Sequence, residues 1–153
     1  MKFEVLPAFP QENWSGSILY KYPDSNMGGN WKTTDPRSEQ RAIQEKNNSS
    51  NGLLCATCRH IRMIRDTSYS SYHLSGILID SFVYDAIGWW HFTREDVDSS
   101  IQLKSYEQEL LDHYNQISLN GLLSPTLAAP GSGTALDTSK DWNILGKILN
   151  KMA

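Results

Sequence analysis

The sequence predicts a mainly α-helical protein, a helical bundle with a small N-terminal pair of β-strands. Apolar residues recur at helical spacing through residues 53–92, where two helices are joined by a short Ser- and Tyr-rich link. A second apolar stripe at helical spacing covers residues 144–152. Strand-like runs occur only within the first 34 residues, and two strands are too few to organise five helices.

The N-terminal segment contains two strand-like runs. Lys2–Ala8 alternates apolar and charged side chains and is interrupted by proline, so we expect a short strand there. The apolar run Ser17–Tyr22 is expected to pair with it, because an isolated strand is not stable. Pro23, Asp24 and a Gly-Gly pair then turn the chain.

A mostly polar helix is expected over residues 36–47. Asp35 suits its N-cap, and the proline that follows suits its first position, where an amide hydrogen has no partner in any case. Only Ala42 and Ile43 offer apolar surface. This helix should therefore lie on the surface of the bundle, and the loop at residues 47–52 follows it.

Residues 53–92 should form the centre of the bundle. The helix Leu53–Asp66 is amphipathic, and the helix Leu74–Phe92 is apolar almost all round, which is typical of a buried helix. Asp80 and Asp85 interrupt the second helix, and an unpaired buried charge costs several kcal/mol. The arginine-rich first helix should supply a partner. The residues of the second helix expected to be most buried are Ile77, Leu78, Phe82 and Ala86.

The remaining chain should add two helices. An acidic loop at residues 93–100 ends in two serines, either of which can cap a helix over residues 101–117. Residues 118–140 are rich in Gly, Ser, Thr and Pro and are expected to be irregular. The last helix buries the apolar stripe at residues 144–152.

Composition argues against several classes of protein. The net charge of −3 gives no basic field, so a nucleic acid partner is not expected. No apolar run suits a membrane span, and the N-terminus lacks the pattern of a signal peptide. Cys55 and Cys58 have the spacing of a redox pair or half a zinc site, but two small apolar residues one helical turn apart is the favoured interpretation. Two free thiols fit a cytoplasmic protein.

Three short motifs carry little chemistry. Asp96 and Asp98 form a D-x-D pattern like that of a two-metal site, but they lie in a polar loop without a preceding strand, and helix capping is the favoured role. The Gly131–Gly133 turn lacks the lysine of a P-loop. Ser, His and Asp occur without the G-x-S-x-G pattern of a hydrolase.

The arginines of the first central helix are a stronger signal. Arg59, Arg62 and Arg65 recur every third residue, and the hydroxyl-rich link 68–75 follows them. Several guanidinium groups near a helix start suit a polyphosphate. A solvated basic face that forms salt bridges with the neighbouring helix fits the composition equally well.

Five segments occur in an order that resembles one known family. They are KFEVLPAF, YPDSNMGGNWKTTDPRSE, LLCATCRHIRMIRD, LSGILIDSF and APGSG followed by DW. Together they resemble the SMODS-type nucleotidyltransferases, bacterial relatives of cGAS and oligoadenylate synthase that make cyclic oligonucleotide signals in antiphage defence. The resemblance covers nearly the whole chain but only the second half of the family's length. It implies the helical lobe of a polymerase-β-like nucleotidyltransferase.

The resemblance also implies site residues. Glu4 stands where the family has its third metal-binding carboxylate, although this sequence has Glu in place of Asp. Arg62 matches a basic residue that contacts nucleotide phosphates, and Ser75 matches a serine with the same role at the start of the next helix. Asp80 matches an acidic residue five positions later. The implied substrates are ATP and GTP, with Mg²⁺ bound in the full-length enzyme.

The predicted organisation is one domain over residues 1–153. Residues 1–34 are expected to be a remnant of the catalytic-lobe sheet with its connecting loop, and residues 35–153 the helical lobe. The family's Gly-Ser and D-x-D pair is absent upstream, and Asp96–Asp98 cannot replace it because it lies after the core helix. The chain should therefore be inactive alone and should need a missing N-terminal catalytic lobe. Such a chain could arise from a split gene, a truncated paralogue or an excised piece. The alternative is a non-catalytic helical interaction module that binds a partner through its exposed front strand.

Overall fold

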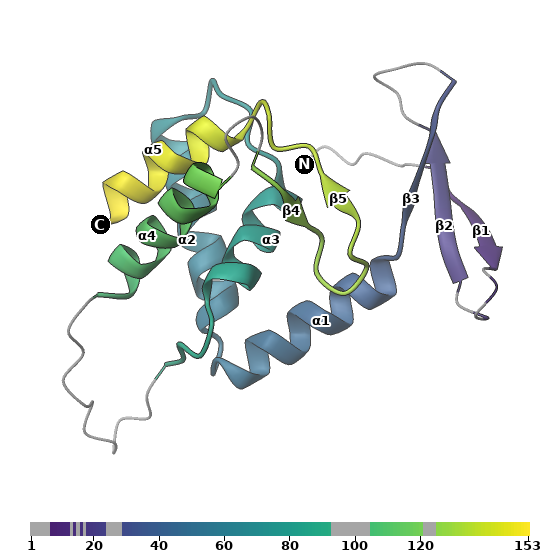
Figure 1. Cartoon of the computed structure of the whole chain (residues 1–153), viewed down its shortest axis with the longest axis horizontal. Coiled ribbons are helices and arrows are strands. Elements are labelled where there is room, and N and C mark those ends of the chain that lie inside the picture. The colour runs from purple at the N-terminus through teal and green to yellow at the C-terminus, as the bar shows by residue number, and fades with distance from the viewer. Residues whose placement is uncertain are drawn as a thin grey trace.

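The computed structural model describes residues 7–12, 14, 16, 18–23, 29–92, 105–120 and 125–153. Within these residues, five helices pack into one body, and a three-stranded sheet stands beside that body next to the start of the first helix (Figure 1). The prediction of a mainly helical fold with a small N-terminal sheet is confirmed.

The N-terminal sheet has three antiparallel strands, whereas the sequence predicted two. β1 (Phe9–Glu12), β2 (Ile18–Pro23) and β3 (Trp31–Thr34) lie side by side in that order. The predicted strand over residues 2–8 falls mostly outside the described residues, and β1 is the partner of β2. β1 contains Pro10, which an edge strand tolerates because an amide hydrogen is not needed on its free side.

α1 (Pro36–Ser49) begins as predicted. Asp35 Oδ1 accepts a hydrogen bond from Ser38 N at 3.1 Å, and Asp35 Oδ2 accepts one from Ser38 Oγ at 2.6 Å. These bonds lower the pKa of the Asp35 carboxyl and satisfy an amide that the helix leaves free. The helix has no buried residue, which confirms its surface position, and it extends two residues beyond the predicted end.

α2 (Leu53–Ser68) and α3 (Gly76–Ala86) form the centre of the body, and six residues of each are buried. α3 is shorter than the predicted helix over residues 74–92. Residues 87–89 form turns after it, and Gly88 has a φ of 51°, outside the right-handed helical region. The helical pattern of apolar residues therefore continues past the end of the helix itself.

One predicted core residue of α3 is not buried. Leu78, Phe82 and Ala86 are buried as expected, but Ile77 is 40% exposed, so its predicted burial was wrong. Ile77 lies in the first turn of α3 and lines a cavity shared with the N-terminal sheet. Helical periodicity alone predicted that Ile77 is buried. The sequence does not show how far the neighbouring elements extend along α3, and so which of its apolar residues they cover.

α4 (Tyr106–Asn120) and α5 (Trp142–Met152) complete the core, although the first predicted residues of α4 lie outside the described residues. An aromatic cluster joins them to α3. The rings of Tyr114 and Trp142 stack with centroids 4.8 Å apart, and the Phe82 ring meets that of Trp142 edge-on at 6.1 Å. The C-terminal stripe is buried as predicted from Ile144 to Leu149, and Met152 at its end is half-buried.

The segment predicted to be irregular contains a short hairpin made of β4 (Leu127–Ala128) and β5 (Ala135–Leu136). Its turn rests on α1, where Ser132 Oγ donates a hydrogen bond to Glu39 Oε1 at 2.9 Å. Gly131 has a φ of 73°, and a Cβ there would meet the Ser38 backbone. The turn is thus shaped by tertiary contacts that the local sequence pattern does not reveal.

Gly146 in α5 should resist enlargement, although alanine is the better helix former. A Cβ at Gly146 would overlap the Tyr114 hydroxyl and lie 2.8 Å from Tyr114 Cε1. We expect Gly146→Ala to lower the free energy of unfolding by about 1–3 kcal/mol, because overpacking a filled core costs that much. Urea denaturation measures this. In a Tyr114→Ser background the same change should be neutral or stabilising, and equal losses in both backgrounds would contradict the steric explanation.

Candidate functional site

The predicted phosphate-binding residues lie around the start of α3. Arg62, on α2, donates from Nη2 to Asp80 Oδ1 at 2.6 Å and to the Gly76 carbonyl oxygen at 3.3 Å. The two side chains of the ion pair are about one-third exposed, at 32% and 31%. The expectation that the arginine-rich helix supplies a partner is confirmed for Asp80 but was wrong for Asp85, which pairs with His113 of α4.

Ser75 is the N-cap of α3, and its hydroxyl oxygen accepts a hydrogen bond from Leu78 N at 3.3 Å. Its own backbone N donates to Asp141 Oδ2 at 2.8 Å. Ser75 therefore lies one residue from the carbonyl that Arg62 binds. The structure brings the two predicted residues to adjoining elements, as expected.

Asp141 binds the start of α3, a contact that the sequence did not predict. It is buried just before α5, and besides Ser75 it binds His73, with Asp141 Oδ1 2.9 Å from His73 Nδ1. It occupies the N-cap position of α5 but makes no capping bond there, because its carboxylate turns toward the start of α3. An aspartate before a helix reads as an ordinary cap, so the sequence carried no signal for this long-range role.

A second arginine supports the same helix start. Arg65 Nη1 donates to the Leu74 carbonyl oxygen at 3.0 Å, and its Nε pairs with Asp66 Oδ1 at 2.7 Å. Arg62 and Arg65 thus bind the backbone on both sides of Ser75. The third arginine of the predicted cluster, Arg59, is exposed on α2.

The start of α3 offers positive charge, part of which is already paired with the carboxylates of Asp80 and Asp141. The start of a helix carries partial positive charge and free backbone N–H groups. Both described bonds of Arg62 use one nitrogen, Nη2, of a group that has five N–H donors. Asp80 holds the guanidinium in place while leaving it partly exposed. A phosphate approaching Ser75 would therefore meet an oriented guanidinium.

The cysteine pair has no such arrangement. Cys58 is buried, and burial followed by the nearby Asp80 carboxylate raises the pKa of its thiol far above the ordinary value. A thiol that stays protonated is a poor nucleophile and metal ligand. Within the described parts of the chain, no group of three or more His, Cys, Asp or Glu side chains could hold a metal ion. Glu4 and the Asp96–Asp98 motif lie outside those parts.

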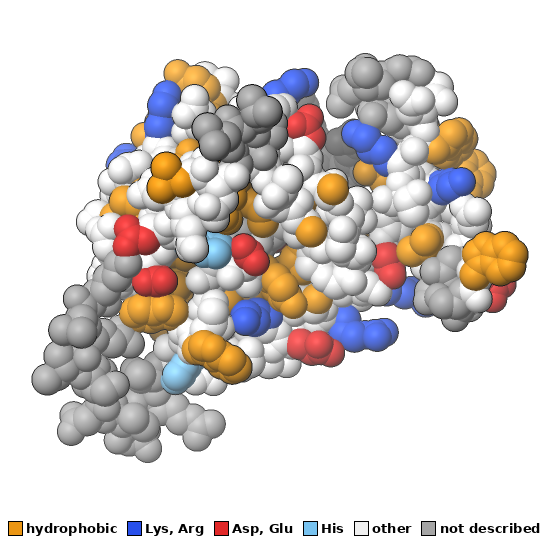
Figure 2. Space-filling model, in the orientation of Figure 1, with side chains coloured by type: hydrophobic (Ala, Val, Ile, Leu, Met, Phe, Trp, Pro, Cys, Tyr) orange, Lys and Arg blue, Asp and Glu red, His pale blue; other side chains and the backbone are white. Residues whose placement is uncertain are grey.

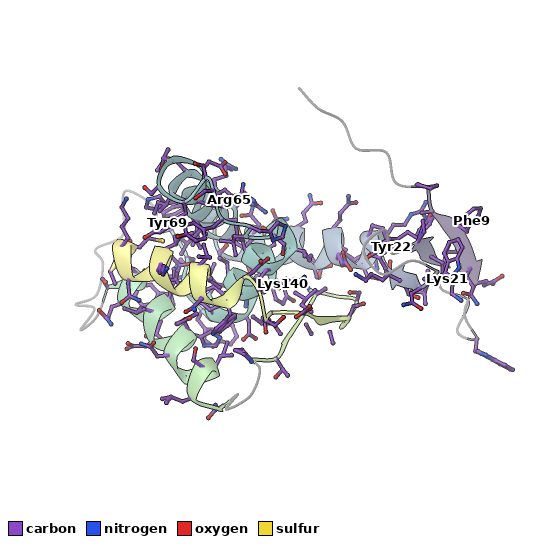
Figure 3. The ribbon with its side chains drawn as sticks, turned by 90° about the horizontal axis from the view of Figure 1, so that it is seen from above. Phe9, Lys21, Tyr22, Arg65, Tyr69 and Lys140 are labelled. Carbon is purple, nitrogen blue, oxygen red and sulfur yellow. The ribbon has the colours of Figure 1, made fainter. Side chains whose placement is uncertain are left out.

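A cavity of about 510 Å³ opens between the sheet and the helical body. Tyr20 and Tyr22 of β2 line it on one side, and Ile77 at the start of α3 lines it on the other. Figure 3 shows Tyr22 on the face of the sheet toward the body, with Phe9 and Lys21 on the far face. Ile77 is two residues after Ser75 in the sequence, but neither Ser75 nor Arg62 lines the cavity. Its complete lining is Ala8, Tyr20, Tyr22, Thr33, Thr34, Pro36, Glu39, Ile77, Ala129, Thr134 and Leu136.

The chain is similar to a known protein along most of its length. The chain is 27% identical over 157 residues to a probable cyclic nucleotide synthase of Bacillus cereus (strain VD146). The match covers 95% of this chain but 46% of that protein, so the chain spans about half the length of the relative. No family model matches the chain, and no solved structure matches it significantly. In the described segments, no helix is both long and apolar enough to cross a membrane.

Proposed function

We propose that this chain is the C-terminal helical part of a nucleotidyltransferase that makes cyclic or linear oligonucleotide second messengers from ATP or GTP in antiphage defence. The observation that carries the proposal is the similarity to a probable cyclic nucleotide synthase along 95% of the chain. The guanidinium groups at the start of α3 support it, because a nucleotide triphosphate needs such an anion site.

The proposed reaction joins two nucleotides. The 3′-hydroxyl of one attacks the α-phosphate of another, a new P–O bond forms, and pyrophosphate leaves with the electrons of the broken bond. Arg62 would bind and orient the triphosphate, and the Ser75 hydroxyl would donate a hydrogen bond to a phosphate oxygen. Asp80 would keep the guanidinium in position.

Magnesium is expected to be held elsewhere in the full-length enzyme. A two-metal site needs several converging carboxylates. The described residues contain no such group, so we assign no catalytic step of this chain to a metal. The catalytic carboxylates, and with them the turnover, are proposed to belong to an N-terminal lobe beyond this sequence.

A second candidate is a non-catalytic interaction module. Phe9 and Trp31 are 57% and 54% exposed, and their rings meet edge-on with centroids 5.6 Å apart. Figure 2 shows apolar side chains gathered over the sheet end of the molecule. Exposed apolar surface of this kind is typical of a contact with another protein or domain. In the first proposal, the same surface would contact the catalytic lobe.

A chimera separates the two proposals. The segment of the Bacillus cereus relative that this chain matches would be replaced by this chain, and products from ATP, GTP and Mg²⁺ would be measured by mass spectrometry. We expect the chimera to make oligonucleotides and the isolated chain to make none. Product from the pure isolated chain would contradict the proposal that the catalytic carboxylates belong to a separate lobe. A folded but inactive chimera, beside an active relative, would favour the interaction module.

A further inference from the structure

The side chain of Ser81, at the centre of α3, lowers the stability of the folded protein. The residue is 1% exposed, and its Oγ has no hydrogen-bond partner among the described residues. A buried hydroxyl without a partner destabilises the folded state. Serine is also a poorer helix former than alanine. Residues that break such local rules concentrate at functional sites.

Ser81 lines a second cavity, of about 360 Å³. Ser81, Tyr84 and Asp85 of α3 form one wall, and the β4–β5 hairpin forms the other through residues 126–131 and Gly133. Ser81 and Asp85 are four residues apart and so lie on one face of the helix. The volume falls in the range of pockets for small molecules, about 300–1,000 Å³.

The charge in this cavity comes from Asp85. Asp85 Oδ2 is 2.8 Å from His113 Nε2, and this hydrogen bond lowers the pKa of the carboxyl, which keeps it ionised at neutral pH. Lys46 lies outside the cavity lining: it donates to the Gly88 carbonyl oxygen, and its Nζ lies 5.9 Å from the centre of the Tyr84 ring. The lining itself contains no Lys or Arg, so it does not suit a phosphate.

We propose that this cavity binds a small group rich in N–H donors, an amine or guanidinium on a short apolar stem. Asp85 pairs with the charged group, and the Ser81 hydroxyl accepts one of its N–H bonds. The apolar hairpin residues contact the stem. This site is separate from the proposed nucleotide site, and its ligand is a free small cation or an arginine side chain of a partner.

Binding is tested with agmatine by NMR titration of the whole chain, with glutarate as the anionic control. A short arginine peptide, compared with its citrulline analogue, distinguishes a partner's side chain from a free ligand. We expect agmatine to shift the amides around Ser81 and Asp85, and glutarate to leave them unchanged. Binding of agmatine alone identifies a free small cation, and equal binding of the peptide identifies a side chain.

Two variants test whether Asp85 and Ser81 bind the ligand. Asp85→Asn should weaken agmatine binding by up to about fivefold, because the Asp85 side chain is 56% exposed and exposed ion pairs contribute about 0–1 kcal/mol. Ser81→Ala should weaken binding while raising the Tm of the free protein, because it removes an unpaired hydroxyl. The control Asp66→Asn, on the exposed side of α2, should leave binding unchanged. Unchanged binding in Asp85→Asn, or a lower Tm in Ser81→Ala, would overturn the proposal.

Discussion

Replacing Phe82 by alanine should lower the free energy of unfolding by about 3–5 kcal/mol, the usual cost of removing a buried phenylalanine side chain. Phe82 has no exposed surface, and its ring meets those of His113, Tyr114 and Trp142 from two other elements. A domain of this size is typically stable by about 5–15 kcal/mol, so the loss is a large fraction of the total. Chemical denaturation followed by circular dichroism measures it.

Two matched variants control for the size of the side chain. Phe82→Leu keeps most of the volume and should cost far less than Phe82→Ala. Phe9→Ala removes the same atoms from an exposed position on β1 and should change stability by no more than about 0.5 kcal/mol. Similar losses for the two alanine variants would show that the sheet, and not α3, anchors the fold.

Replacing Arg62 by alanine should reduce kcat/KM of the active chimera roughly ten- to a hundredfold. A charge-assisted hydrogen bond contributes about 1.5–3 kcal/mol, and this loss corresponds to that range. The Tm should fall little, because the Arg62–Asp80 pair is about one-third exposed and such pairs contribute about 0–1 kcal/mol. Steady-state kinetics and a thermal melt on the same variant provide both quantities.

Arg59 offers a matched control for that variant. It is an exposed arginine on the same helix, so Arg59→Ala should alter neither kinetics nor Tm. The opposite pattern in Arg62→Ala, a Tm lower by several degrees with unchanged nucleotide affinity, would restrict Arg62 to the ion pair with Asp80. It would then have no place in the nucleotide site.

The helices could be predicted because each depends on local signals. The Asp-Pro pair fixes the start of α1, and the apolar stripes of α2 and α5 show which faces are buried. The strands of the N-terminal sheet were harder to predict. β1 contains a proline, and β3 is a run of Trp, Lys and Thr without alternation, so neither has the pattern of a buried strand. These strands are defined by their pairing with β2, which a single segment cannot reveal.

The features of the candidate site also differ in whether a local sequence signal predicts them. The pairing of Asp80 with the arginine-rich helix was predicted from the high cost of an unpaired buried charge. Arg62 is that partner, although the side chains of the pair are about one-third exposed. The bond between Asp141 and the Ser75 amide spans 66 residues and has no local signature. Ile77 was misplaced because the sequence cannot show a cavity, and the hairpin at residues 127–136 was missed because its turn depends on contacts with α1.

The three-stranded sheet has a thermodynamic consequence. Its described residues are exposed or half-buried, with none in the core, whereas α2 and α3 each have six buried residues. The free energy of local unfolding varies across a protein with the apolar contacts that each unit makes. The strands should therefore open and exchange their amide hydrogens long before the helical body unfolds. A partner that covers the sheet face carrying Phe9 and Trp31 would then also stabilise the strands. Binding of that partner and ordering of the strands are therefore thermodynamically linked.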